Sequence, residues 1–227
     1  MESSKQKKVI GIIREVKSKW ERRCAITPWE VHELTKDGKI TVLVQPSPSR
    51  CYTDEEFIEA GAHIQEDLSE CDVIFGVKEV PMEALIPNKT YFFFSHTIKA
   101  QEYNMGLLDT MLAKNIRMID YECIREVAKR EGVVPNRLVA FGRYAGIAGA
   151  FDFFRGIGEF MLQKKLQTPF IFLGSTYMYE DYEMMKQALS NVARNIAKSG
   201  TPKAYSPMVF AVTGTGRVAQ GILEVLE

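Results

Sequence analysis

The stretch Tyr91–Lys99, YFFFSHTIK, places four consecutive aromatic residues directly before a serine and a histidine. Aromatic residues favour β-strands, and an unbroken apolar run is typical of a strand that is covered on both faces. Such strands belong to parallel sheets, in which helices lie on either side. The stretch therefore predicts a central strand over 91–94 whose carboxyl end carries His96.

The segments around this strand alternate between two patterns through the first 120 residues. Short runs rich in β-branched residues predict four further strands, over 9–13, 40–44, 73–77 and 116–119. N-cap and capping-box patterns predict two helices, from Pro28 to near Gly38 and from Thr53 (TDEE) to near Gly61. An amphipathic pattern predicts a third over 101–114. Strands that alternate with helices at this spacing predict an α/β fold with parallel βαβ units.

A different pattern begins at about Leu138, where small residues are set among aromatics. The segment 138–164 predicts a helix with five glycines, each of which costs an isolated helix about 1 kcal/mol. We therefore expect other backbone to pack closely against them. Charged residues interrupt the segment, which argues against a membrane span. A further helix is predicted over 177–198, followed by a connector over 200–207.

The final segment predicts a nucleotide-binding loop. A strand over 208–212 leads into G-x-G-x-x-A, and a helix follows. This order provides a tight turn, close backbone approach to a pyrophosphate, and a helix N-terminus that faces it. The predicted cofactor contacts are Gly214, Gly216, Arg217 and Ala219. The alternative is that the glycines form only a turn.

The position of this loop predicts that the chain is a fragment. Only 227 − 216 = 11 residues follow Gly216, whereas the residue that selects NAD or NADP lies about 20 residues further on. We therefore expect a nucleotide-binding unit that is truncated.

Composition indicates no charge-driven partner. Lys+Arg and Asp+Glu both number 29, and 46% of the residues are apolar, so neither nucleic acid nor a membrane is an expected partner. The four cysteines are scattered without ligand spacing, so we expect no metal site and no disulfide framework. The N-terminus MESSKQKKVIGI carries no signal or presequence pattern, which favours a cytoplasmic location.

Three polar residues follow predicted strands. Lys78, His96 and Glu122 each come just beyond an apolar run, and the carboxyl ends of parallel strands border the ligand crevice. We expect the three to converge there and to hold and pass protons near neutral pH. Taken singly, each is also compatible with a structural role, as a solvated lysine, a satisfied histidine or a surface glutamate.

A pair of arginines, Arg22 and Arg23, precedes the first predicted helix. A solvated basic pair is one interpretation. The other is a guanidinium fork that binds a substrate carboxylate.

Motifs along the chain resemble a known superfamily. ERRCAITP at 21–28 is similar to the signature that opens alanine dehydrogenases, nicotinamide nucleotide transhydrogenase N-terminal domains and saccharopine dehydrogenases. Within that group, the motifs at 93–109 (FFSHTIKAQEYNMGLLD), 117–122 (RMIDYE) and 137–149 (RLVAFGRYAGIAG) resemble lysine–2-oxoglutarate reductases, which form the first half of α-aminoadipic semialdehyde synthases.

The resemblance implies a domain organisation and a reaction. A parallel, Rossmann-like substrate domain would cover 1–137, linking helices 138–206, and the incomplete start of an NAD(P)-binding Rossmann domain 207–227. Lysine and 2-oxoglutarate would condense to an imine that NADPH, or NADH as the alternative, reduces to saccharopine. The implied partners are these small molecules, a C-terminal saccharopine dehydrogenase domain in the full-length chain, and further copies in a homo-oligomer. A mitochondrial location is the alternative to a cytoplasmic one.

The resemblance also implies residue roles. Lys78 and His96 would be the acid–base pair, and Glu122 would modulate Lys78. Arg23 would bind a substrate carboxylate, Arg137 would add a charge nearby, and Lys99 would be a second substrate contact.

Other functions remain open at this point. They are a lysine-forming saccharopine dehydrogenase, an alanine dehydrogenase or transhydrogenase domain, and a dicarboxylate-binding module without turnover. We also expect the fragment alone to lack reductase turnover.

Overall fold

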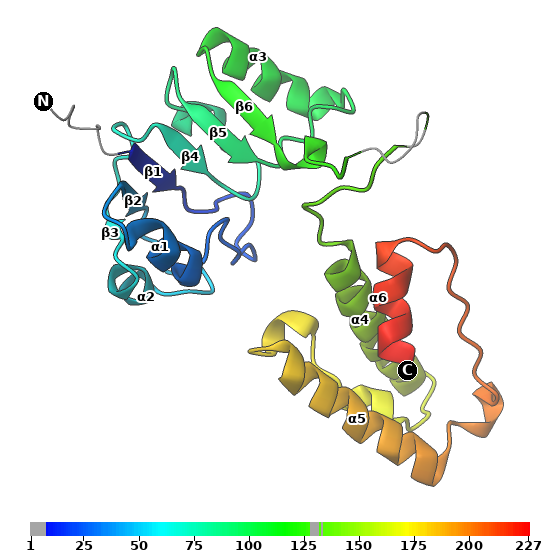
Figure 1. Cartoon of the computed structure of the whole chain (residues 1–227). Helices are drawn as coiled ribbons and strands as arrows, with labels where there is room; N and C mark the ends of the chain where they lie inside the picture. Colours follow the sequence, from blue (N-terminus) through cyan, green and yellow to red (C-terminus); the bar gives the residue numbers. More distant parts are fainter. Residues whose placement is uncertain (1–7, 128–131, 133) are drawn as a thin grey trace, which may run out of the picture. The chain divides into compact units, whose positions relative to one another are not determined.

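The computed structural model describes residues 8–127, 132 and 134–227, and the chain divides into two compact units (Figure 1). Unit 1 is Met1–Val139 and unit 2 is Ala140–Glu227. Residues 1–7, on which the expected lack of a presequence partly rests, lie outside the described residues.

Unit 1 is built on one six-stranded sheet in which every neighbouring pair is parallel. The strands are β1 Lys8–Ile12, β2 Ile40–Val44, β3 His63–Ile64, β4 Val73–Phe75, β5 Thr90–Phe93 and β6 Arg117–Asp120. Their order is β3-β2-β1-β4-β5-β6. The predicted α/β parallel-sheet fold is thus confirmed, and the order is that of doubly wound dinucleotide-binding sheets, which reverses between β1 and β4.

Three helices cover this sheet, and local sequence explains where they begin. They are α1 Pro28–Thr35, α2 Asp54–Glu59 and α3 Met105–Ala113. At α2 the Thr53 hydroxyl accepts from the Glu56 amide at 3.2 Å, and the Glu56 carboxylate accepts from the Thr53 amide at 2.6 Å. This reciprocal capping satisfies two amides that the helix leaves without partners.

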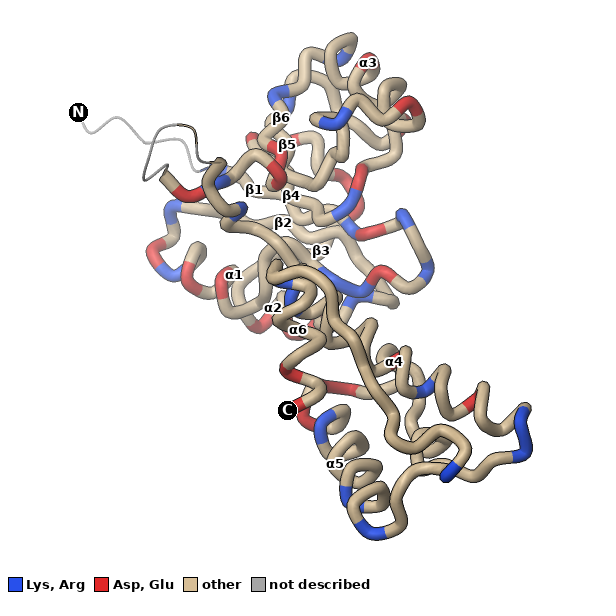
Figure 2. The backbone as a smooth tube through the Cα atoms, turned by 90° about the vertical axis from the view of Figure 1, so that its right-hand side faces the viewer, with Lys and Arg blue, Asp and Glu red and all other residues tan. Residues whose placement is uncertain are grey.

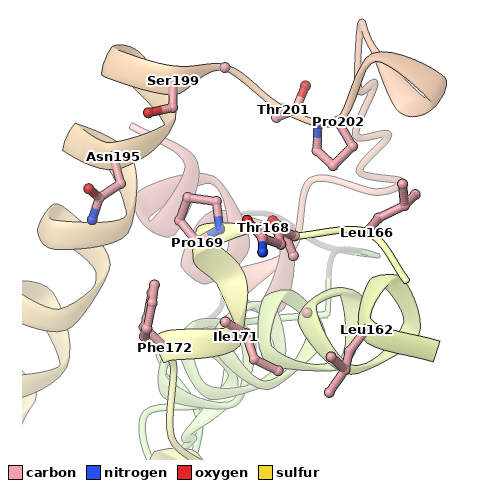
Figure 3. A pocket seen from close by; sticks show the side chains of 13 residues that line it. Leu162, Leu166, Thr168, Pro169, Ile171, Phe172, Asn195, Ser199, Thr201 and Pro202 are labelled. Carbon is pink, nitrogen blue, oxygen red and sulfur yellow. The ribbon is translucent and has the colours of Figure 1, made fainter. Parts of the chain in front are cut away.

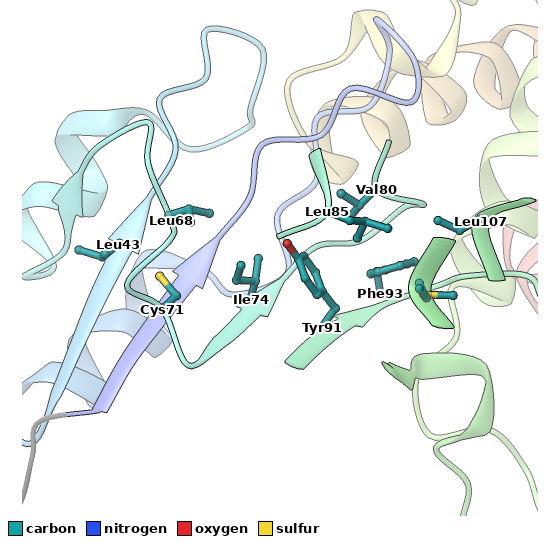
Figure 4. Packing of buried hydrophobic residues seen from close by; sticks show 10 residues of the cluster. Leu43, Leu68, Cys71, Ile74, Val80, Leu85, Tyr91, Phe93 and Leu107 are labelled. Atoms are coloured by element: carbon teal, nitrogen blue, oxygen red, sulfur yellow. The ribbon is translucent and has the colours of Figure 1, made fainter. Parts of the chain in front are cut away.

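Two apolar clusters lie on opposite faces of the sheet. The first packs under α3 and includes Ile74, Tyr91, Phe93 and Leu107 (Figure 4). The second, which we call the α1–α2 cluster, joins the strands β1 and β2 to both helices and consists of Ile12, Val31, Val42, Val44, Phe57, Ala60 and Ala62. Alternation along each strand places neighbouring residues in different clusters.

The prediction that 91–94 is covered on both faces is only half right. Tyr91 and Phe93 are fully buried, whereas Phe92 and Phe94 are half-buried. Phe92 and Phe94 point to the face of the sheet that carries the α1–α2 cluster. The helices α1 and α2 pack against β1 and β2, so they do not cover β5. Phe92 instead stacks on Phe75 of β4, with ring centroids 4.6 Å apart.

Other differences from the predicted elements in unit 1 are small. Strand β3 has two residues and was not predicted, because a strand so short carries no periodic signal. The helix predicted over 101–114 begins with a 3-10 turn at Glu102–Asn104 before α3. Two further 3-10 turns are Met82–Ala84 and Tyr121–Cys123.

Unit 2 contains three helices around an apolar cluster that includes Ile147, Phe151, Phe154, Phe170 and Val192. The helices are α4 Gly142–Gln163, α5 Tyr182–Ser199 and α6 Arg217–Leu226, and 3-10 turns lie at Pro169–Phe172, Thr176–Met178 and Lys203–Tyr205. The predicted helix over 177–198 therefore begins five residues later, at Tyr182. Its N-cap is Asp181, whose side chain accepts from the Met184 amide at 2.8 Å.

The glycines of α4 fall into two groups. A Cβ at Gly146 would lie 2.0 Å from the carbonyl oxygen of Val218 on α6, and one at Gly158 would lie 2.7 Å from the backbone of Phe170. A Cβ at Gly149 or Gly156 would meet nothing within 4 Å. Close backbone packing therefore explains Gly146 and Gly158. Gly142 is a weaker case, since its Cβ would lie 3.1 Å from the Cβ of Arg217. It does not explain Gly149 or Gly156.

The strand predicted over 208–212 is wrong in this structure. The segment has no regular secondary structure, and no ladder hydrogen bond joins it to other described residues. A parallel strand needs a neighbouring strand to pair with, and none of the six described strands lies in unit 2.

Charge is mixed along both units, as Figure 2 shows by the alternation of blue and red segments along the tube. None of the helices in the described part of the chain is long and apolar enough to pass through a membrane.

Candidate active site

The carboxyl edge of the unit 1 sheet gathers charged side chains from four segments. The crevice of a doubly wound sheet lies outside the carboxyl ends of its strands, where the strand order reverses. Here that point falls between β1 and β4, which are followed in the chain by Glu15 and Lys78. His96 follows β5 and Glu122 follows β6.

Glu15 joins the ends of β1 and β4 directly. Its carboxylate accepts the backbone amides of Val77 at 2.6 Å and Lys78 at 2.9 Å. Burial raises the pKa of Glu15, and these two amides counteract the rise in part. Glu15 therefore fixes the backbone of Lys78 at the point where the strand order reverses.

His96 is held by a glutamate from the neighbouring strand end. Its Nδ1 lies 2.7 Å from Oε1 of Glu79, whose side chain is 9% exposed. Burial raises the pKa of Glu79, but a bond from its own amide and the contact with His96 outweigh it, so the net pKa is lowered. His96 has a φ of +54°, a left-handed conformation that is uncommon for a histidine.

Glu122 forms a second buried carboxylate, next to β6. Its side chain is 5% exposed, and Oε1 accepts from a guanidinium nitrogen of Arg137 at 2.7 Å. Arg137 reaches Glu122 because the segments around 124–126 and 136–138 pair in antiparallel fashion. The Leu138 amide donates to the Ile124 carbonyl and the Glu126 amide donates to the Asn136 carbonyl, both at 2.9 Å.

Two carboxylate oxygens at this edge are buried without a donor. Among the described residues, neither Oε2 of Glu79 nor Oε2 of Glu122 accepts a hydrogen bond. The Lys17 ammonium is 3.6 Å from Oε2 of Glu79, which is an ion pair but too long for a hydrogen bond. Buried acceptors without partners are uncommon in native proteins and are often found where a protein acts on a ligand.

Arg23 is paired with an acidic neighbour. Its Nε and a terminal nitrogen donate to the two carboxylate oxygens of Glu21 at 2.8 and 2.7 Å. The bond to Arg23 is the main reason that the pKa of Glu21 is lowered, and the charge of Lys78 contributes. The Glu21 carboxylate therefore lies within electrostatic range of both Arg23 and Lys78.

A network of buried polar groups supports the ends of β5 and β6. Ser95, fully buried, bonds through its hydroxyl and its amide to one oxygen of Asp120. The other oxygen of Asp120 accepts the Glu122 amide at 2.7 Å. Asn104 donates to the Ser95 carbonyl at 2.9 Å. These bonds fix the backbone on both sides of His96 and Glu122.

The structure thus brings the predicted residues to one sheet edge but does not join them all. Within the described residues, no hydrogen bond or ion pair links Lys78 to His96 or to Glu122. Lys99 is exposed, in the turn closed by the bond from Ala100 to Thr97. The Arg22 carbonyl accepts the Cys51 amide at 2.8 Å.

Sequence reasoning missed Glu15, Glu21 and Glu79. Their signals were present: Glu15 follows β1 as Lys78 follows β4, and Glu79 directly follows Lys78. If the search for polar residues just beyond a strand had been applied to every strand, it would have found Glu15 and Glu79. Glu21 is two residues from Arg23, so a check for local charge pairs would have found it.

The loop in unit 2 keeps the geometry of an anion site at a helix N-terminus. Gly216 is the N-cap of α6, and Gly214 has a φ of +87°. A Cβ at either glycine would meet nothing within 4 Å. Arg217 is exposed, whereas Ala219 is buried at 4% exposure. These residues fit a pyrophosphate, which backbone amides and the helix dipole would hold.

A cavity of about 640 Å³ in unit 2 is lined by none of these residues (Figure 3). Its walls are mostly apolar, as with Leu162, Ile171 and Phe172, and Asn195 and Thr168 are among its polar members. None of the residues that line it titrates, so it offers no acid–base chemistry. No group of three His, Cys, Asp or Glu side chains in the described ranges could hold a metal ion.

Known proteins resemble this chain over most of its length. The α-aminoadipic semialdehyde synthase of Arabidopsis thaliana is 41% identical over 224 residues, which are 96% of this chain and 20% of that protein. The mitochondrial enzyme of that name from Bos taurus is 42% identical over 219 residues, 96% of this chain and 23% of that protein. The saccharopine dehydrogenase [NAD(+), L-lysine-forming] of Yarrowia lipolytica is 27% identical over 90% of this chain and 53% of that protein.

The chain therefore spans about a fifth of the length of the first two relatives. A family described as alanine dehydrogenase/PNT, N-terminal domain, matches residues 11–148. This range contains every candidate residue of the sheet edge and all six strands, except for the first residues of β1. This chain belongs to the alanine dehydrogenase/PNT N-terminal domain family.

Proposed function

We propose that this chain is the substrate-binding part of a lysine–2-oxoglutarate reductase, together with the opening of its nucleotide-binding unit. The observation that carries the proposal is the carboxyl edge of the sheet, where His96 and Lys78 lie with two buried carboxylates, Glu79 and Glu122, that each keep one oxygen without a hydrogen bond. Identity of 41–42% to α-aminoadipic semialdehyde synthases over 96% of the chain supports it.

The reaction requires proton transfer in both directions at one carbon. The ε-amine of lysine adds to the ketone of 2-oxoglutarate, and loss of water from the carbinolamine gives an imine. A base must take a proton from the amine, and an acid must give one to the departing hydroxyl. Histidine exchanges protons near neutral pH, so His96 suits either task.

Glu79 and Glu122 have complementary roles in this proposal. Glu79 holds Nδ1 of His96, which leaves Nε2 to face the substrate. The oxygens of Glu79 and Glu122 that accept no hydrogen bond would favour a positive charge nearby. Lys17 already supplies one at 3.6 Å from Glu79, and the substrate ammonium and Lys78 would supply others. Lys78, whose backbone Glu15 fixes, would act as the second acid–base group.

Three basic residues would bind the carboxylates of the substrates. The condensed product carries three of them, and guanidinium groups bind carboxylates with two parallel bonds. Arg23 and Arg137 are paired with Glu21 and Glu122 here, so substrate carboxylates would share or replace those partners. Lys99, exposed beyond His96, would be a further contact.

Unit 2 would supply the first part of the cofactor site. The residues Gly214, Gly216, Arg217 and Ala219 would hold the pyrophosphate of a nicotinamide nucleotide, for which we propose NADP, with NAD as the alternative. When bound, that cofactor supplies the hydride that reduces the imine. We propose the domain boundaries 1–137, 138–206 and 207–227, with the last range as the start of a Rossmann domain.

The relatives, of which this chain spans about a fifth, support a larger protein. We propose a full-length protein that also contains a saccharopine dehydrogenase domain and forms a homo-oligomer. The bovine relative is named as mitochondrial, and a cytoplasmic location is the alternative for this protein.

The test is a calorimetric titration of this chain with saccharopine, 2-oxoglutarate and lysine, repeated with Lys78→Met and His96→Gln. Lys39→Met is the control, because the Lys39 side chain is 82% exposed and directly precedes β2. We expect the parent and the control to bind saccharopine equally and the two site variants to bind it at least tenfold more weakly. Absence of binding to the parent, or equal binding by all four proteins, would refute the proposal.

A further inference from the structure

A buried arginine lies in the loop that follows β2, at the carboxyl edge of the sheet. The Arg50 side chain is 3% exposed, and its guanidinium carbon lies 4.4 Å from the centre of the Phe57 ring in the α1–α2 cluster. A buried charge is costly unless its donors are satisfied. The proposed reaction gives Arg50 no task, and a side chain so deeply buried does not reach a substrate.

Arg50 closes its loop by bonds to both ends of it. One terminal nitrogen donates to the Gln45 carbonyl at 3.0 Å, just after β2, and the other donates to Oδ1 of Asp54 at 2.5 Å, at the start of α2. Its Nε donates to the Tyr52 carbonyl at 3.1 Å. The same oxygen of Asp54 accepts the Ser47 amide at 3.3 Å. One side chain thus fixes the loop at its beginning and at its end.

The loop in turn holds the segment that contains Arg23. The Cys51 amide donates to the Arg22 carbonyl at 2.8 Å, so the residue next to Arg50 binds the backbone immediately before Arg23. Cys24, immediately after Arg23, packs against the α1–α2 cluster. The backbone before Arg23 is therefore held by the loop that Arg50 closes, and the backbone after it by the cluster on which Arg50 stacks.

We propose that Arg50 is a positioning residue for Arg23. It fixes the loop after β2 and, through the bond from Cys51 to Arg22, holds the Arg23 guanidinium where a substrate carboxylate binds. The inference rests on the proposed function, in which Arg23 binds such a carboxylate, and adds a residue that touches no substrate.

The contacts of Arg50 suit arginine and not lysine. The acceptors are two carbonyls and a carboxylate from three different residues. A planar guanidinium bonds all three at once through its three nitrogens, whereas lysine has a single nitrogen on a flexible chain. Methionine would fill a similar volume but would leave all three acceptors without this donor.

A double-mutant cycle tests the proposal by calorimetric titration with saccharopine. Arg50→Met, Arg23→Met and the double variant are compared with the parent. Arg117→Met is the matched control, because Arg117 is exposed at the opposite, amino end of the sheet. We expect the control to bind as the parent does and Arg50→Met to bind more weakly by about tenfold or more. Because Arg50 acts through Arg23, the double variant should bind no more weakly than Arg23→Met.

Two results of the cycle would overturn the inference. The first is a folded Arg50→Met variant that binds saccharopine as tightly as the parent does. The second is a double variant that loses about tenfold in affinity relative to Arg23→Met, because Arg50 would then act independently of Arg23.

Amide hydrogen exchange gives a readout that needs no ligand. In Arg50→Met we expect the amides of Cys51 and Arg23 to exchange faster by about tenfold or more, because the loop opens locally. The Val77 amide, which Glu15 holds at 2.6 Å, should keep its rate. An increase at Cys51 without one at Arg23 would show that Arg50 shapes only its own loop, and the inference would be wrong.

Arg50→Lys covers the case in which Arg50→Met does not fold, which thermal unfolding reveals. Lysine keeps a positive charge beside Asp54 but cannot bond both carbonyls, so we expect smaller changes in the same direction in affinity and in exchange. If Arg50→Lys matched the parent in both, the inference would be refuted. If the parent itself bound no saccharopine, the proposed function would fail, and the exchange rates at Cys51 and Arg23 would still decide the inference.

Discussion

Nδ1 of His96 lies 2.7 Å from Oε1 of Glu79, and this contact joins the carboxyl ends of two neighbouring strands. The histidine follows β5 and the glutamate follows β4, and the two strands pair in parallel. Because the strand ends are fixed by the sheet, the imidazole is oriented before any substrate binds.

Replacing Glu79 by glutamine should lower stability in a pH-dependent way. The net pKa of Glu79 is below 4.5 in the folded chain, so its contribution is fully present above about pH 4.5 and is lost as pH falls through the folded pKa. At neutral pH we expect a loss of about 1 kcal/mol, since glutamine keeps a weaker hydrogen bond. Thermal unfolding of parent and variant between about pH 5.5 and 3.5 measures this, and a gap that widens toward acid would contradict it.

Glu15 should show the opposite pH dependence. Burial raises its pKa above 4.5, so the folded chain binds the proton more tightly than the unfolded chain does. The stability that Glu15 contributes is therefore fully present below about pH 4.5 and is lost as pH rises through the folded pKa. Glutamine does not titrate, so Glu15→Gln is the reference. We expect the melting temperature of the parent to fall relative to that of Glu15→Gln as pH rises from about 4 to about 7. A constant difference over that range would show that the pKa of Glu15 is not raised.

The pair of Glu122 and Arg137 should be coupled in stability. Arg137→Ala leaves a carboxylate that is 5% exposed without its 2.7 Å partner, and we expect a loss of about 2 kcal/mol because Arg137 is itself partly exposed. Glu122→Gln with Arg137→Ala should lose less than the sum of the single losses. Urea denaturation of the four proteins gives the coupling, and additive losses would show that the ion pair contributes nothing.

The sequence predicted the sheet well because its signals are local. Capping residues such as Thr53 and apolar runs such as 40–44 act within a few residues, so a linear reading identifies them. The prediction from sequence was wrong at β3, which it missed, and at 208–212, where it expected a strand. Strand β3 has two residues and forms by pairing with β2, and 208–212 has a strand sequence but no described neighbour to pair with.

The candidate site was predicted only in outline for a related reason. The rule that polar residues follow buried strands placed Lys78, His96 and Glu122 at one edge. It could not give partners, because Glu15 bonds to residues 62 and 63 positions away and His96 is 17 positions from Glu79. Those contacts depend on which strands are neighbours, and strand order is not a local property of the sequence.

The glycines of α4 provide a test in which helix propensity and packing predict opposite signs. Alanine is favoured over glycine by about 1 kcal/mol in a helix interior, so Gly149→Ala, whose Cβ would meet nothing within 4 Å, should stabilise unit 2 by up to that amount. Gly146→Ala would place its Cβ 2.0 Å from the Val218 carbonyl oxygen on α6. The backbone of α6 must move to admit it, and we expect a net loss of about 2 kcal/mol or more. Urea denaturation compares both with the parent. If Gly146→Ala stabilised the chain as much as Gly149→Ala, then α4 and α6 would not pack backbone to backbone, and the small-residue seam would have another cause.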